Sequence, residues 1–182
     1  MPPEKEIVRR SCEVGGEALR LLEEALGVRS LSEALDCNEL LCVKRGDATD
    51  LFCVTDSLSQ LIERIERNCE PLVGLTHAGI LLGSMRGELF EPSIHLAYVL
   101  ARMISRRRLE PRRGIAVVLG PGEGVFTRSK VVGRPLYELR GANDLNLYLV
   151  LSERGDPLGW GRIERGRLVP LVDSGWFLRA GG

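Results

Sequence analysis

Residues 145–172 read LNLYLVLSERGDPLGWGRIERGRLVPLV, and this stretch decides the fold of the C-terminal part. Apolar and β-branched runs alternate in it with the turns Arg154-Gly155-Asp156 and Glu164-Arg165-Gly166. Short β-prone runs separated by glycine-containing turns are typical of antiparallel strands joined by tight connections. The stretch therefore predicts three consecutive short strands.

The same rhythm begins just after Pro111, with GIAVVLG at residues 114–120 and RPLYELRG at residues 134–141. Short strands with tight turns at this spacing predict a small barrel or sandwich. The change of rhythm falls between Arg108 and Arg113, where Glu110-Pro111 interrupts a basic run. We therefore expect two domains, residues 1–108 and residues 112–182.

The N-terminal part has helical and hairpin patterns instead. Its first apolar stripe, at alternating steps of four and three, consists of Val8, Cys12, Gly15, Leu19, Leu22 and Leu26. This spacing predicts an amphipathic helix that stops at Gly27. Two β-prone runs, ELLCVKR (39–45) and DLFCVT (50–55), then predict a hairpin across Gly46 to Thr49.

Two more helices and a bent strand region complete the N-terminal part. Ser57 with Gln60 matches a capping box that opens a helix to about Asn68. The segment at residues 72–90 predicts strands bent at Gly79 and Gly83 and turned at Gly87. Pro92 and Ser93 are expected to open a third helix whose Leu96, Leu100, Met103 and Ile104 face inward. The fold class is α+β, with a small antiparallel sheet flanked by helices before the C-terminal β domain.

Composition places the protein among globular chains of the cytoplasm. Apolar residues make up 44% of the 182 positions, enough for a packed core. No run of about 18 apolar residues exists, and the charged start MPPEKEIVRR lacks the apolar segment of a secretory signal. We expect neither membrane insertion nor export.

The charge balance changes along the chain. Residues 1–108 hold 14 Lys+Arg and 17 Asp+Glu, net −3, whereas residues 109–182 hold 11 and 8, net +3. Ten of the 11 C-terminal cations are arginines, which suit bidentate phosphate contact and base stacking. A charge of +3 is ordinary by itself, so it indicates nucleic acid only weakly.

The cysteines give no metal-binding pattern. Among Cys12, Cys37, Cys42, Cys53 and Cys69 there is no CxxC pair, and no histidine pair lies near them. All but Cys37 have apolar neighbours and are interpreted as small buried packing residues, with a disulfide as the alternative. We expect no metal site.

Catalytic patterns are also missing. The turn VVLGPGEGV, with Gly120, Gly122 and Gly124, resembles a cofactor-binding glycine loop, but we expect no helix directly after it and no further βαβ unit. His77 and His95 have no nucleophile or carboxylate at a spacing typical of a triad. The sequence therefore predicts a protein that is not an enzyme and holds no cofactor.

Two arginine groups are candidates for RNA contact. Arg106, Arg107 and Arg108 end the third helix, where cations also complement the helix dipole, and this plainer role is favoured. Arg162, Arg165 and Arg167 cluster on the last hairpin, where Arg165 and Arg167 are expected to share a face and Arg162 to join them across the turn. A phosphate grip and a solvated hairpin with one charge pair to Glu164 are equally compatible with this spacing.

The chain also resembles a known family. The segments VVLGPGEGVFTRSKVV, LNLYLVLSERGDPLGWGRI and LVPLVDSGWFLR resemble the PUA domain, named for pseudouridine synthase and archaeosine transglycosylase. The whole arrangement is similar to archaeal UPF-type PUA proteins, relatives of the eukaryotic ribosome-biogenesis factor of large-subunit maturation. The anchors of this resemblance are Gly79, Gly83, Phe90, Pro92, Leu96, Leu119 to Pro121, Gly155 to Gly159, Asp173, Gly175, Phe177, Leu178 and Arg179.

The resemblance implies an N-terminal α/β domain for protein partners, such as ribosome-assembly proteins, and a C-terminal PUA pseudobarrel that binds RNA. The candidate RNA-binding residues are Arg162, Arg165, Arg167, Arg128, Lys130, Arg179, Gly122 and Gly124. The leading expectation is a non-catalytic factor for pre-rRNA processing or large-subunit assembly. The alternative is a protein of RNA modification that uses the PUA domain to deliver its substrate.

Overall fold

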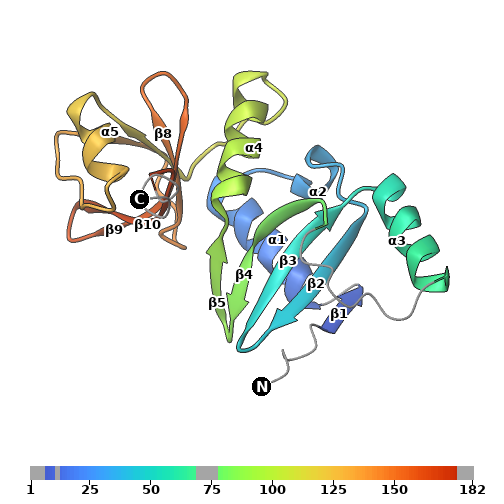
Figure 1. Cartoon of the computed structure of the whole chain (residues 1–182). Coiled ribbons are helices and arrows are strands. Elements are labelled where there is room, and N and C mark those ends of the chain that lie inside the picture. Colours follow the sequence, from blue (N-terminus) through green and yellow to red (C-terminus); the bar gives the residue numbers. More distant parts are fainter. Residues whose placement is uncertain (1–6, 11–12, 69–77, 176–182) are drawn as a thin grey trace. The chain divides into compact units, whose positions relative to one another are not determined.

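The computed structural model of the chain describes residues 7–10, 13–68 and 78–175. Its fold is α+β, as predicted, with two five-stranded sheets (Figure 1). Contacts between Cα atoms divide the chain into two compact units. Unit 1 comprises Met1–Arg20 and Ser30–Ser93, and unit 2 comprises Leu21–Arg29 and Ile94–Gly182.

Unit 1 contains an antiparallel sheet in which each strand pairs with the next one along the chain. Its strands are β1 (Ile7–Arg10), β2 (Glu39–Arg45), β3 (Ala48–Val54), β4 (Ile80–Arg86) and β5 (Leu89–Pro92). The predicted hairpin is confirmed, but its turn is only Gly46-Asp47, because Ala48 and Thr49 already pair within β3. The bend at Gly83 is confirmed as well, opposite an irregularity between Leu51 and Phe52.

The first helix, α1 (Glu13–Leu26), is shorter than predicted. Val8 lies in β1 and pairs with Val43, so its place in the apolar stripe was a coincidence of spacing. The predicted stop is confirmed: Gly27 has φ 62°, and Val28 N donates to Glu23 O (3.1 Å). Glycine adopts this left-handed conformation without a Cβ clash.

Helix α3 (Asp56–Asn68) covers one face of the first sheet. Leu41, Val43, Phe52 and Val54 of β2 and β3 form a buried cluster with Ile62 of this helix. The helix begins one residue before Ser57, so this residue lies in its first turn and not at the predicted cap. A four-residue helix, α2 (Leu31–Ala34), precedes β2 and was not predicted.

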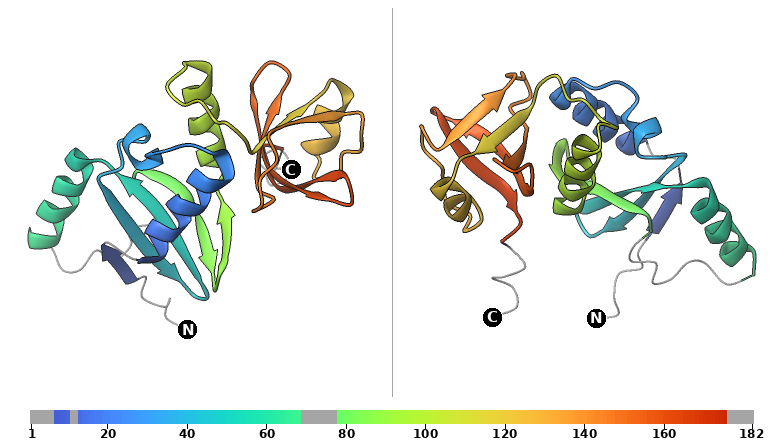
Figure 2. Two further views of the ribbon diagram at one scale, coloured as in Figure 1. Left: turned by 180° about the vertical axis from the view of Figure 1, so that it is seen from behind. Right: turned by 90° about the horizontal axis from the view of Figure 1, so that it is seen from above.

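Unit 2 contains a mixed sheet, drawn in yellow to red in Figure 2, whose strands coincide with the predicted ones. The strand order is β10-β9-β8-β6-β7. They are β6 (Ile115–Val118), β7 (Tyr137–Arg140), β8 (Tyr148–Ser152), β9 (Pro157–Glu164) and β10 (Arg167–Asp173). Strands β6 and β8 are parallel neighbours. Within residues 78–175 no strand pairing joins the edge strands β7 and β10, so the sheet is not a closed barrel.

Two helices belong to unit 2 besides the end of α1. Helix α4 (Ile94–Ser105) packs against β9 and buries Leu96 and Leu100 as predicted, while Met103 and Ile104 are half-buried. Arg106 to Arg108 form the exposed turn after this helix and do not belong to its last turn. Helix α4 groups with the second sheet by its contacts. The domain boundary expected between residues 108 and 112 concerns which segments fold independently, so it stays a prediction.

The second helix is α5 (Pro121–Phe126), which directly follows β6. The expectation that no helix follows the glycine-rich turn was therefore wrong. Pro121 at its first position and the burial of Gly122 and Phe126 against the sheet favour helix here despite two glycines. None of the helices within the described ranges is long and apolar enough to cross a membrane.

Candidate nucleic-acid interface

The last hairpin, β9–β10, presents Arg162 and Arg167 on one outer face. Arg167 pairs with Glu164, and Val169 pairs with Arg162, so these four side chains share a face. Ile163 and Leu168 pair on the opposite, inner face. The expectation that Arg165 shares a strand face with Arg167 was wrong, because Arg165 forms the two-residue turn with Gly166. The φ angles of these two residues are 50° and 73°. Both values are positive, as in a type I′ turn, which projects Arg165 from the hairpin end.

The segment after α5 lies beside this hairpin. Val132 N donates to Leu168 O (2.8 Å), and Leu168 N donates to Val132 O (2.9 Å). This antiparallel bridge brings residues 128–134 next to β10. Residues 128–134 and the hairpin β9–β10 together carry six exposed cations, which we call the basic surface: Arg128, Lys130, Arg134, Arg162, Arg165 and Arg167.

Only one acidic residue, Glu164, lies in residues 128–134 and 162–167. Its Oε1 is 2.6 Å from Nε of Arg162, with both side chains about half exposed. An exposed pair of this kind contributes at most about 1 kcal/mol, so a phosphate can replace Glu164 as the partner of Arg162. Arg165 and Arg167 have no hydrogen bond or ion pair within the part of the chain that the structure describes.

Two buried side chains hold the basic surface in place. Asp173 is 4% exposed and accepts hydrogen bonds from Ser129 Oγ (2.5 Å) and Gly175 N (2.9 Å). It thus ties the turn between Arg128 and Lys130 to β10. Tyr137, also buried, donates from its hydroxyl to Gly166 O (2.7 Å) and so connects β7 to the hairpin turn.

Arg134 is a member of this surface that sequence reasoning missed. Its guanidinium carbon lies 5.8 Å from the ring centroid of Tyr137, a cation–π distance. The sequence does place Tyr137 three residues after Arg134. This spacing indicates a place in the basic surface only once Tyr137 is known to contact the hairpin turn. A shallow hollow of about 380 Å³ lies on the surface, lined by Val131, Glu164, Arg165, Arg167 and Val169.

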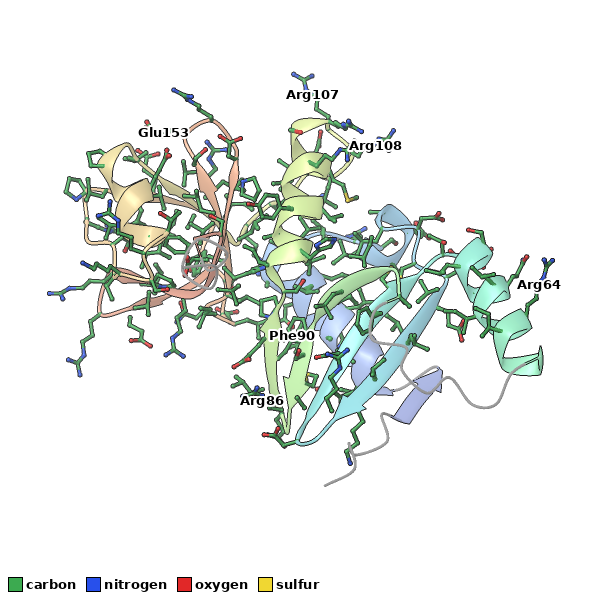
Figure 3. The ribbon with its side chains drawn as sticks, viewed as in Figure 1. Arg64, Arg86, Phe90, Arg107, Arg108 and Glu153 are labelled. Carbon is green, nitrogen blue, oxygen red and sulfur yellow. The ribbon has the colours of Figure 1, made fainter. Side chains whose placement is uncertain are left out.

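The other predicted residues are scattered. Gly122 is buried against Leu136 and Val118, whereas Gly124 is exposed on α5. Arg179 and His77 lie outside the described residues, and His95 is exposed on α4. Gly120 N at the glycine-rich turn donates to Oε2 of Glu153 (2.8 Å), so a carboxylate of the protein itself occupies this donor; Figure 3 shows Glu153 on the β8–β9 connection.

One cysteine forms a disulfide, the alternative to plain packing. Cys42 is buried, as predicted, and is also disulfide-bonded, so the alternative of a disulfide is confirmed there. Cys12 and Cys69 lie outside the described residues. Cys53 is free and buried, as expected, and Cys37 is free and half-buried. Within residues 13–68 and 78–175 no three His, Cys, Asp or Glu side chains gather as metal ligands.

Cys37 and Cys53 contact each other and titrate differently. The thiol of Cys53 donates to the sulfur of Cys37, which lowers the pKa of Cys37 although burial opposes this; Val54 N acts in the same direction as Cys53. The same hydrogen bond and burial raise the pKa of Cys53. Because the thiolate is the reactive form, Cys37 is the more nucleophilic of the two.

We therefore predict that Cys53→Ala slows alkylation of Cys37. Removing the donor raises the pKa of Cys37, so at about pH 7 iodoacetamide should react with it roughly threefold to tenfold more slowly. Peptide mass spectrometry over a pH series measures this rate, with Leu89→Ala, an exposed site, as the control variant. An unchanged pH profile in Cys53→Ala would contradict the pairing of the two sulfurs.

Comparison with known proteins adds a relative. No model of a known protein family matches the chain. A UPF0113 protein from the archaeon Aeropyrum pernix is 32% identical over 146 residues, which cover 75% of this chain and 72% of that protein. At this identity and over most of both chains, common descent is established, and the protein belongs to the UPF0113 family.

Proposed function

We propose that this protein binds single-stranded RNA through the basic surface of unit 2, without catalysing a reaction on it. The proposed role is in pre-rRNA processing or assembly of the large ribosomal subunit, as the PUA resemblance implies. Unit 1 would then serve contacts with other assembly proteins. RNA is the proposed partner because its phosphates match arginine-rich surfaces in charge and geometry.

The observation that carries this proposal is the concentration of charge beside one bridge. The C-terminal residues 109–182 have a net charge of only +3, but residues 128–134 and 162–167 alone hold six cations and one acid. The Val132–Leu168 bridge puts the two segments side by side. Concentrated positive charge with few competing carboxylates attracts a phosphate backbone far more than the same charge spread over a domain.

The fold of unit 2 supports a PUA-like assignment. Five short strands, a parallel pair β6–β8, a helix directly after β6 and the bridge from residue 132 to β10 form a compact mixed β unit. Its core is contributed by strands and by α5 through Phe126, Tyr148 and Leu168. We therefore propose that the unit is a PUA-like pseudobarrel with β10 on its RNA-facing side.

Titration of the full chain with labelled single-stranded RNA tests the function. The logarithm of the affinity should fall with the logarithm of salt concentration, with a slope of about −2 or steeper for three or more phosphate contacts. Unmeasurable binding at about 50 mM salt, or binding without salt dependence, would contradict the proposal. Mass analysis of the recovered RNA should show no change; a modified nucleotide would favour the RNA-modification alternative.

A crosslinking experiment in cell extract tests the proposed place of action. RNA crosslinked to the protein should be enriched in precursors of large-subunit rRNA over other transcripts. The variant without Arg162, Arg165 and Arg167 serves as the control, because its crosslinks report contact that does not depend on the basic surface. Equal recovery of all RNA classes would contradict the ribosomal role and leave RNA binding itself intact.

A further inference from the structure

A groove of about 520 Å³ lies in unit 2 between α4 and the β8–β9 turn. This volume is within the range of roughly 300–1,000 Å³ that is common for sites of small ligands. The side chains relevant here are Tyr98 and Arg102 from α4 and Arg154 and Asp156 from the turn. None of them belongs to the basic surface, so the groove is a separate feature.

Tyr98 is the unusual residue of this groove. It is 48% exposed, whereas Tyr137 and Tyr148 are 4% exposed each. The inner face of α4 is formed by Leu96, Ala97, Leu100 and Ala101, so Tyr98 is not needed for packing of the helix. An aromatic ring left at the wall of a groove offers a stacking surface for a planar ligand.

The opposite wall is rigid. Ser152 Oγ accepts hydrogen bonds from Arg154 N (3.2 Å) and Asp156 N (3.0 Å), and Ser152 N donates to Asp156 O (2.8 Å). Gly155 N donates to Ser152 O (3.0 Å), which closes the turn. These bonds hold the side chains of Arg154 and Asp156 at the rim of the groove without using the Arg154 guanidinium.

The charges of the groove suit a nucleotide. Arg102 and Arg154 are exposed and have no ion pair within the described part of the chain. Asp156 is the one acid among the described residues of the lining, and only its Oδ2 has a partner among them, Ser152 Oγ at 3.3 Å. Two cations attract phosphates, while a carboxylate oxygen accepts from an amino group of a base.

We infer that this groove is a second RNA contact that holds one nucleotide of a single strand. Its base stacks on Tyr98, Arg102 and Arg154 contact the flanking phosphates, and Asp156 accepts from an N–H group on the edge of the base. That donor is an exocyclic amino group in cytosine, adenine or guanine and N3–H in uracil. The inference rests on the proposed RNA binding and adds to it a position where one base is stacked and held by its edge.

The substitution Tyr98→Ala tests the stacking contact in the full chain. Affinity for single-stranded oligocytidine should fall about tenfold, and the salt slope should stay unchanged because no cation is lost. Tyr98→Phe keeps the ring and should bind like the wild type. The Arg107→Ala, Arg108→Ala variant is the matched control for the removal of Arg102 and Arg154, since these exposed arginines follow the same helix (Figure 3) but do not line the groove.

Loss of the two cations and loss of the carboxylate should affect the salt slope differently. Arg102→Ala with Arg154→Ala should weaken binding and flatten the salt slope by about 1.4 units, the value for two phosphate contacts on a single strand. Asp156→Ala should weaken binding while the salt slope stays unchanged, because an acceptor for the base is lost and no cation is removed. Photocrosslinking with 5-iodocytidine RNA should modify the tryptic peptide of residues 87–102, which contains Tyr98.

The outcomes separate the two proposals. If Tyr98→Ala binds as tightly as the wild type while the variant of the last hairpin loses RNA, the groove is not an RNA site and the proposed function stands. Absence of binding by the wild type would overturn both. Crosslinks confined to peptides outside residues 87–102 would overturn the groove alone. Circular dichroism of each variant establishes that it is folded, as expected for changes at exposed side chains.

Discussion

Replacing Arg162, Arg165 and Arg167 together by alanine is expected to weaken binding of single-stranded RNA roughly a hundredfold at about 50 mM salt. Each phosphate contact contributes about 0.7 to the salt slope for a single strand, so the slope should flatten by about two units. The loss should be similar for different base sequences, because contacts to phosphates do not read bases. Titration of wild type and variant with the same RNA at several salt concentrations measures both quantities.

Folding of this variant should be preserved. All three arginines are exposed, and substitutions at exposed positions usually change the free energy of unfolding by no more than about 0.5 kcal/mol. Arg165 has φ 50°, a conformation that alanine tolerates no worse than arginine does, so the turn gains no new strain. The control variant is Arg20→Ala, Arg64→Ala, Arg86→Ala, which removes the same charge from exposed sites of unit 1.

Glu164→Gln supplies a change of the opposite sign. It removes the one acidic residue of residues 128–134 and 162–167 and frees Arg162 from its 2.6 Å ion pair. Affinity should therefore rise, by about threefold to tenfold at low salt, since a repulsive charge disappears from the surface.

For the triple arginine variant, a loss of affinity equal to that of its control variant would contradict the prediction. Such a result would show that overall charge, and not the hairpin, holds the RNA.

The strands of unit 2 could be predicted from the sequence because their signals are local. Apolar runs and turn glycines are read within a few residues, and β6 to β10 coincide with the predicted runs. Which strands become neighbours is not a local property. The parallel pairing of β6 with β8 joins segments separated by α5 and β7, and no pattern within a few residues encodes it.

The errors at β1 and α5 have the same origin. Val8 fits the helical spacing of Leu19 and Leu22, yet its pairing with Val43 makes it part of a sheet. In PGEGVF two glycines argue against a helix, but burial of Phe126 in the core of unit 2 favours one. In both places tertiary contacts outweigh a weak local propensity.

Only part of the candidate site could be predicted from the sequence. Arg165 and Arg167 stand close together along the chain, so their clustering could be read directly. Lys130 and Arg134 join them only through the bridge between Val132 and Leu168, and the contact of Tyr137 with Gly166 is equally remote. A basic surface assembled from distant segments therefore requires the fold before it can be recognised.

The Gly155-Asp156-Pro157-Leu158-Gly159 segment combines a glycine that tolerates a side chain with one that does not. Gly159 has φ 141°, and a Cβ built there would lie 2.0 Å from Val172 O, in the backbone of the neighbouring strand β10. Gly155 has φ 86°, but nothing lies within 4 Å of its Cβ position. Both glycines thus have a backbone conformation that disfavours L-residues, but only Gly155 has space for an added Cβ atom.

Gly159→Ala is accordingly expected to lower the free energy of unfolding by about 3 kcal/mol or more, because backbone strain and displacement of β10 add together. Gly155→Ala is its control and should cost about 1–2 kcal/mol, the conformational part alone. Guanidinium unfolding followed by tryptophan fluorescence measures both, since Trp160 is fully buried beside Gly159 and reports on unit 2. The strand β10 carries Arg167, so Gly159→Ala should also weaken RNA binding while Gly155→Ala leaves the basic surface intact. Equal unfolding midpoints for the two variants would contradict the close approach of β9 and β10 at this position.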